Sequence, residues 1–275
     1  MAHIPLEDGI ADIIGKAQRG LGVNDEELSR RAEVSIDDIN ALKSGKPLTA
    51  VARRIARHLQ LNPSALEAFI KTPPYPRVQP FRSGFMMFNT PYEDMTVNSY
   101  LVWDPRSRQA AAFDTGTDCA GMFDIVEIEK LDLRYIFITH THEDHIADIK
   151  KLSDKAPLAE IWSSEAEPLE HPRAKTFREN AHFHIGSLAV KTLLTPGHSA
   201  GMTTYYISGL GYPLAIVGDS LFSCSTGGSE THFREQIKNN RAKIFTLPRD
   251  TVLACGHGPL TTLEFERAHN PFYLR

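Results

Sequence analysis

A short apolar strand followed at once by four metal-binding side chains most constrains how this chain can fold. Residues 135–139, Tyr-Ile-Phe-Ile-Thr, have the β-branched and aromatic composition of a buried strand. His140, His142, Asp144 and His145 follow within six residues. Alternate side chains of an extended segment point the same way, so His140 and His142 can bind one metal ion. Asp144 and His145 fall where the chain turns into a helix, so they can face a second metal ion.

The donor atoms of this segment indicate the kind of metal. Imidazole and carboxylate groups suit Zn²⁺, Fe or Mn²⁺, and they do not suit Ca²⁺ or a thiolate site. The alternative is a solvated polar loop that happens to be rich in histidine. Four such side chains in this order, directly after an apolar strand, favour a metal site over that alternative.

Residues 1–72 are predicted to form a compact, all-helical bundle. Apolar residues recur at helical spacing in the segment 6–17, with Gly20 as a candidate terminator. Asn24 and Ser35 can cap two further helices, Thr49 opens a fourth, and Asn62-Pro63 opens a fifth.

Residues 73–80 are rich in proline and are predicted to link this bundle to a larger domain at 81–275. That second region alternates strand-like and helical segments, which is typical of the α/β class. The expected strands are Met95–Trp103, Ala110–Phe113, Tyr135–Thr139, Ala159–Trp162, Leu188–Leu194, Thr203–Ile207, Leu214–Val217 and Val252–Ala254, and the expected helices are Cys119–Lys130, His145–Lys155 and Glu230–Arg241.

Composition excludes several classes of protein. The formal net charge of -4 provides no global basic field for nucleic acid. Three widely spaced cysteines do not form a disulfide framework, and no run of residues is apolar enough to cross a membrane. The start of the chain lacks the features of a signal peptide. We therefore expect a cytoplasmic protein that acts on a small molecule and does not bind a membrane.

Further segments, in order, extend the resemblance of the histidine-rich motif to a known family. The segment 140–145, His-Thr-His-Glu-Asp-His, resembles the HxHxDH signature of the metallo-β-lactamase superfamily. The other matching segments are Asp114-Thr-Gly, Pro-Gly-His198, Gly-Asp219-Ser-Leu-Phe and Cys-Gly-His257-Gly. Each later segment is weak by itself, since a lone turn histidine or aspartate is often only solvated, but five ordered matches are specific.

The resemblance implies a fold and a set of metal ligands. The implied fold is an αββα sandwich of two face-to-face sheets, preceded here by the small helical bundle. The resemblance assigns His140, His142 and His198 to one metal ion and Asp144, His145 and His257 to another, with Asp219 bridging both. Two divalent ions are thus expected, zinc first, with iron or manganese as alternatives.

The same resemblance implies a reaction. A hydroxide held between two cations would attack an ester or thioester carbonyl, and Asp144 would accept a proton. The segment after Asp219 resembles glyoxalase II, a hydroxyacylglutathione hydrolase. The sequence departs from glyoxalase II where that enzyme holds glutathione: Gly228 and Glu230 replace a lysine and a tyrosine, and Pro259 replaces a second tyrosine. Glutathione recognition is therefore in doubt.

Two alternatives remain open. The persulfide dioxygenases of the superfamily share HxHxDH but use one iron, and they would differ by metal count and oxygen consumption. Residues 24–60 also resemble the helix-turn-helix of the lambda-repressor/Cro-like family, which would make the chain a DNA-binding regulator with a ligand-sensing domain. Asp37 and Asp38 at the start of the recognition helix would repel phosphates. A structural or dimerising role of the helices, as in a homodimer, is therefore favoured over DNA binding.

Overall fold

The N-terminal helices begin and end largely where capping residues predict. A computed structural model describes residues 3–79 and 81–273. The side chains of Asn24, Ser35 and Asn62 accept hydrogen bonds from the backbone at the start of the second, third and fifth helices, which confirms these three predictions. The helices in this part are α1 (Ile10–Leu21), α2 (Asp25–Ala32), α3 (Ile36–Lys43), α4 (Thr49–His58) and α5 (Pro63–Lys71).

Two details of this region differ from a simple reading of the sequence. Gly20 lies inside α1, and the helix ends instead at Gly22, whose φ of 66° is the left-handed conformation that glycine adopts without strain. Glu33 takes the same conformation, with φ of 52°, in the turn between α2 and α3. The resemblance of this region to a helix-turn-helix, and the preference for a structural or dimerising role over DNA binding, stay predictions.

The strands of the described residues form two sheets. One sheet has seven strands in chain order: β1 (Phe81–Arg82), β2 (Phe85–Tyr92), β3 (Met95–Trp103), β4 (Gln109–Phe113), β5 (Asp132–Phe137), β6 (Glu160–Ser164) and β7 (Ala174–Phe177). The other has six, in the order β13 (Thr261–Thr262), β12 (Val252–Cys255), β11 (Leu214–Gly218), β10 (Thr203–Ser208), β9 (Leu188–Leu194) and β8 (His182–Ile185). Pairing is parallel from β4 to β7 and between β11 and β12, and antiparallel elsewhere.

Aromatic side chains fill the space between the two sheets. Phe113 and Phe137 of the first sheet lie with ring centroids 5.3 and 5.2 Å from that of Tyr205 in the second. On the outer face of the first sheet, Ile136 packs with Met122 and Leu152. The helices that supply these two residues are α6 (Ala120–Ile128) and α8 (Ile149–Lys155). The predicted αββα sandwich, preceded by helices, is confirmed.

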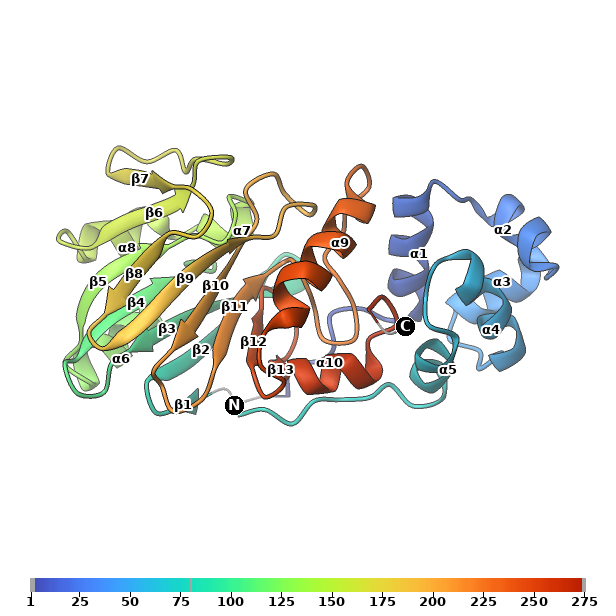
Figure 1. Cartoon of the computed structure of the whole chain (residues 1–275), viewed down its shortest axis with the longest axis horizontal. Coiled ribbons are helices and arrows are strands. Elements are labelled where there is room, and N and C mark those ends of the chain that lie inside the picture. The colour runs from blue at the N-terminus through green and yellow to red at the C-terminus, as the bar shows by residue number, and fades with distance from the viewer. Residues whose placement is uncertain (1–2, 80, 274–275) are drawn as a thin grey trace.

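The outer face of the second sheet carries both C-terminal and N-terminal helices. Helices α9 (Phe233–Lys243) and α10 (Leu263–His269), with the 3-10 turn Ile244–Thr246, lie between this sheet and α1–α5 (Figure 1). One buried apolar cluster joins Ile13 and Ile14 of α1 to Phe233 of α9 and to Val217 of β11. The helical part therefore shares a core with the sandwich, while the division into domains at residues 73–80 stays a prediction.

The helix expected at His145–Lys155 is broken in two. A short helix, α7 (Glu143–Ile146), precedes α8, and the two do not join. The backbone N–H of Asp148 donates to Thr115 Oγ1 at 3.1 Å, and the Asp148 carboxylate accepts from the backbone of Cys119. These bonds direct residue 148 toward the 114–119 loop and hold α7 against it.

No helix of the described residues is long and apolar enough to span a bilayer.

Glu266, a fully buried carboxyl on α10, gives stability a specific pH dependence. Burial raises the pKa of Glu266 from 4.5 to about 7, against hydrogen bonds from Thr261 and Asn270 that lower it. Because the folded pKa is raised, this stabilisation is complete below pH 4.5 and is lost as pH rises through about 7. We expect the free energy of unfolding to fall by about 3 kcal/mol from this group over that interval.

Glu266→Gln should remove this part of the pH dependence, because the amide can occupy the same site without ionising. Denaturant unfolding followed between pH 5 and 8 measures it. Glu264→Gln, on the same helix but 67% exposed, is the control. An equal slope in wild type and Glu266→Gln would contradict the assignment.

Candidate metal centre

Four segments that are distant in the sequence deliver the seven predicted ligands to one edge of the sandwich. His140 and His142 follow β5, and α7 carries Asp144 and His145. The remaining three follow strands of the second sheet: His198 after β9, Asp219 directly after β11, and His257 after β12. Strand ends place these side chains, because each ligand other than those on α7 follows within five residues of the end of a strand held by its ladder.

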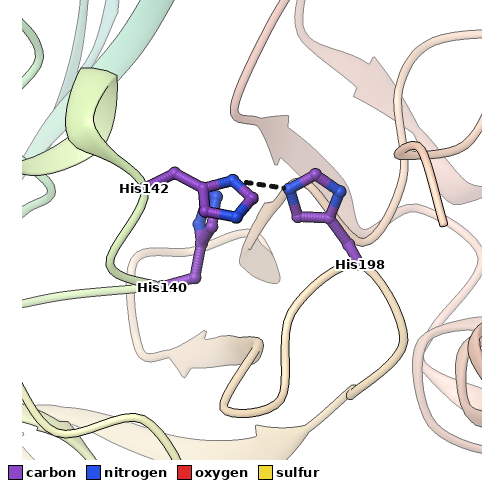
Figure 2. A group of neighbouring side chains, drawn as sticks. All are labelled: His140, His142 and His198. Carbon is purple, nitrogen blue, oxygen red and sulfur yellow. Dashed lines mark hydrogen bonds between the residues drawn. The ribbon is translucent and has the colours of Figure 1, made fainter. Parts of the chain in front are cut away.

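The seven side chains converge into three overlapping groups. The groups are His140, His142 and His198; His140, His145 and Asp219; and Asp144, His145 and His257, and within each group the potential ligand atoms lie within 4.8 Å of one another. Figure 2 shows the first group, in which His198 Nε2 lies 3.0 Å from His142 Nδ1. The structure thus brings together every residue that the sequence singled out.

Asp219 lies between two halves of the cluster. One half contains His140, His142 and His198, and the other contains Asp144, His145 and His257. Its Oδ2 is 3.4 Å from His198 Nε2 and 3.5 Å from His257 Nε2, while its Oδ1 is 3.2 Å from His145 Nε2. On the far side, Asp144 Oδ2 lies 3.2 Å from His257 Nε2. One carboxylate therefore faces imidazoles from both halves of the cluster.

Several polar atoms at this point fit a bound cation. Within residues 3–79 and 81–273, His140 Nε2, His145 Nε2 and Asp219 Oδ1 are buried and make no well-aligned hydrogen bond, although the last two lie 3.2 Å from each other. An unsatisfied buried polar atom costs roughly 1–3 kcal/mol, so three converging in one place need an explanation. Imidazole nitrogens and carboxylate oxygens are the donors that Zn²⁺, Fe and Mn²⁺ accept.

The second ring nitrogen of four histidines is held from outside the cluster. His140 Nδ1 meets Thr139 Oγ1 at 3.0 Å, and His145 Nδ1 meets Asp114 Oδ2 at 2.8 Å. His198 Nδ1 and His257 Nδ1 lie 2.7 and 2.8 Å from the carbonyl oxygens of Gly228 and Thr96. Donation from Nδ1 to an oxygen fixes each ring and leaves the Nε2 lone pair facing the centre.

The charges of the cluster are coupled. Burial alone would lower the pKa of His145 and His257, but the Asp219 carboxylate raises both above the ordinary value for histidine. In turn, although burial acts to raise it, the pKa of Asp219 is held well below its usual range by His257 and His145. The carboxylate and the two imidazoles therefore shift each other's affinity for protons, and a divalent ion that binds them would compete with protons.

Asp114 positions the centre without belonging to it. Its carboxylate accepts from the backbone and hydroxyl of Thr139, both at 2.7 Å, and from His145. It therefore joins the end of β5 to α7. The sequence marked Asp114 as part of a matching motif, but not this role.

Glu167 was missed altogether. Its Oε1 accepts from the backbone and hydroxyl of Thr141 at 2.7 and 2.8 Å, and its Oε2 accepts from the Gly201 backbone at 2.8 Å. This carboxylate connects the loop that carries His140 and His142 to the loop that carries His198. Its sequence context, Ser-Glu-Ala-Glu-Pro, gave no signal that separated it from surface glutamates.

Two glycines allow the backbone to approach Asp219. A Cβ at Gly227 would overlap the Asp219 carbonyl oxygen, and a Cβ at Gly256 would overlap its carboxylate. A larger residue would displace the Asp219 backbone at the first position and its carboxylate at the second.

Glu167→Gln should weaken metal binding by about tenfold, because the amide NH₂ would face a backbone donor and loosen the connection between the two ligand loops. Competition with a chromophoric chelator measures the affinity. Glu165→Gln, which alters only an ion pair with the 85% exposed Arg178, is the matched control. Equal affinities in the two variants would contradict the positioning role.

Comparisons with known proteins agree with this geometry. The family description "Metallo-beta-lactamase superfamily" matches residues 92–257, more than half of the chain. A hydroxyacylglutathione hydrolase of Pseudomonas entomophila (strain L48) is 29% identical over 173 residues, which are 62% of this chain and 66% of that protein. This chain thus spans slightly less than two thirds of that curated relative.

Solved structures share the fold at low identity. A metallo-beta-lactamase from Staphylococcus aureus subsp. aureus COL matches with a TM-score of 0.61 and 22% identity, covering 70% of this chain and 62% of that one. ETHE1 from Myxococcus xanthus matches with a TM-score of 0.59 and 24% identity, covering 68% and 83%. By its sequence match and its fold, the chain belongs to the metallo-beta-lactamase superfamily.

Proposed function

We propose that this protein is a metal-dependent hydrolase that cleaves a thioester or ester and resembles glyoxalase II in its reaction. The observation that carries the proposal is the convergence of five histidines and two aspartates, with Asp219 facing both halves of the cluster. The similarity to a hydroxyacylglutathione hydrolase supports a thioester as the substrate.

The proposed ligands follow the three groups. His140, His142 and His198 would hold one divalent ion, Asp144, His145 and His257 a second, and Asp219 would bridge them. Two such ions, zinc by the proposal, would supply Lewis acidity that lowers the pKa of water and stabilises negative charge on the reacting carbonyl oxygen.

The chain's own residues would orient the reactants. A pocket of about 620 Å³ opens beside the centre, and both His142 and His198 line it. A larger pocket, of about 780 Å³, is lined by none of the seven residues. We therefore place the substrate in the pocket beside His142. The Asp144 carboxylate, which is nearly buried and faces the centre, would accept a proton during attack.

Cys224 is excluded as the nucleophile by its surroundings. It lies near Asp219 in sequence but is fully buried, and burial raises the pKa of its thiol far above the ordinary value. A thiol held protonated and away from solvent is a poor nucleophile. The hydrolysis is therefore assigned to the His/Asp cluster alone.

Asp219→Asn should reduce bound metal below two ions per chain and lower hydrolysis by at least about 100-fold, because the bridging charge is lost. Elemental analysis of purified protein gives the metal content. Asp132→Asn, which removes a 57% exposed carboxylate on β5, is the control. Full metal content in Asp219→Asn would refute the bridging assignment.

Chelation should abolish turnover, and added metal should restore it. The assay follows thiol release from a panel of thioesters that includes a hydroxyacylglutathione, with esters and lactones in parallel. Metal-loaded protein that hydrolyses none of them would overturn the proposed function. Oxygen consumption with a persulfide by protein that holds a single iron would assign it to the dioxygenases instead.

A further inference from the structure

One wall of the pocket beside the metal centre comes from the N-terminal helical part. Most residues that line the 620 Å³ pocket belong to the sandwich: the loop 196–200, the segment 228–232 and Glu235 of α9. Arg19 of α1 lines it as well. Because the same pocket reaches His142 and His198, a substrate that reacts at the centre can also reach Arg19.

Lys16, one turn before Arg19, fixes α1 against the pocket. Its ammonium donates to Asp8 Oδ2 at 2.5 Å and to the Thr226 carbonyl at 2.9 Å, and it lies 4.6 Å from the centroid of the Phe222 ring. The Lys16 side chain is only 11% exposed. Asp8 also accepts from Ser225. The segment that follows Asp219 contains Phe222, Ser225 and Thr226. Through Lys16, α1 therefore contacts the loop that carries Asp219 directly.

Two glycines set the position of Arg19 on this wall. A Cβ at Gly20 would overlap the Phe233 ring of α9, so glycine permits the close approach of α1 to α9 at this point. A Cβ at Gly15 would lie 3.0 Å from Arg19 Nη1, so glycine also leaves room for the guanidinium along the helix. The backbone position of Arg19 therefore follows from the close packing of α1 on α9, and its 55% exposed side chain extends from there into the pocket.

Arg19 is the one lysine or arginine among the described residues that line this pocket. Glu230, Glu235 and His232 are the other titratable groups there, apart from His142 and His198. Arg19 Nε lies 3.8 Å from Glu230 Oε1, with side chains 55% and 76% exposed. An exposed pair of this kind contributes roughly 0–1 kcal/mol, so a substrate carboxylate can replace Glu230 as the partner of the guanidinium.

We propose that Arg19 is a specificity-determining residue that binds a carboxylate on the part of the substrate that does not react. This inference rests on the proposed function, since it places the substrate in the pocket beside His142. The carboxylate can belong to the acyl group or to the leaving thiol. Glu230 opposes binding of this substrate carboxylate, because the Glu230 side chain competes for the same guanidinium.

Three matched thioesters separate these sources. S-acetyl-N-acetylcysteamine carries no charge, S-succinyl-N-acetylcysteamine carries a carboxylate on the acyl group, and S-acetyl-3-mercaptopropionate carries one on the leaving thiol. The measured quantity is the ratio of kcat/KM for each charged thioester to that for the neutral one, with zinc-loaded protein. We expect one charged thioester to be preferred by wild type.

Substitutions at Arg19 and Glu230 should move this ratio in opposite directions. The ratio meant is that of the charged thioester which wild type prefers. Arg19→Gln should lower this ratio by about tenfold, Arg19→Lys should lower it less, and Glu230→Gln should raise it. Arg30→Gln, which removes an exposed Arg–Glu pair on α2, is the matched control and should leave the ratio unchanged. Metal content, measured in each variant, separates substrate recognition from metal loss. An unchanged ratio in Arg19→Gln, or a lowered one in Glu230→Gln, would overturn the inference.

A binding measurement keeps the inference testable if none of the three thioesters is hydrolysed, a result that bears on the proposed function. Succinate and monomethyl succinate are titrated calorimetrically into zinc-loaded wild type and Arg19→Gln. Tighter binding of succinate that is lost in Arg19→Gln supports the carboxylate site. The same preference in both proteins, or no preference in wild type, refutes it.

Discussion

The buried carboxylate of Asp219 is the constraint around which this end of the molecule is organised. A carboxylate that is removed from water is costly unless nearby charges compensate it. Three histidines from three segments lie within 3.5 Å of its oxygens, and their attraction keeps it ionised. The arrangement concentrates negative charge and lone pairs at one point, which is what a pair of divalent ions requires.

The sandwich holds these charged and polar side chains together because most of them stand near the ends of paired strands. The aromatic layer between the sheets fixes the strands, and the hydrogen bonds of Asp114 and Glu167 fix the loops that extend from them. The cluster is therefore supported by two kinds of contact: apolar packing that sets where a strand ends, and carboxylates that tie neighbouring loops together.

Local sequence was sufficient for much of the fold and for the candidate site. The strands β3 and β9 have the residue bounds that their composition predicts, because each is a continuous apolar or alternating run. The seven side chains that the motifs single out come together as the resemblance implies. Each strand and each motif depends on residues that are close in sequence, whereas the meeting of the motifs at one site followed only from the resemblance to the family.

The rest depends on contacts between distant residues. The strand β2 was not predicted, because its Pro91 and polar Asn89 interrupt the pattern, and its pairing with β3 supplies the order instead. Glu167 could not be distinguished from a surface acid until Thr141 and Gly201 were placed beside it. The sequence likewise did not predict that α1 shares a core with α9 and β11, since an amphipathic helix does not specify which apolar surface it will cover. Because α1 shares this core, heat or denaturant should disrupt the helices and the sandwich in one cooperative transition. A fragment lacking residues 1–72 would uncover apolar residues of the shared core, Phe222 among them, and should aggregate.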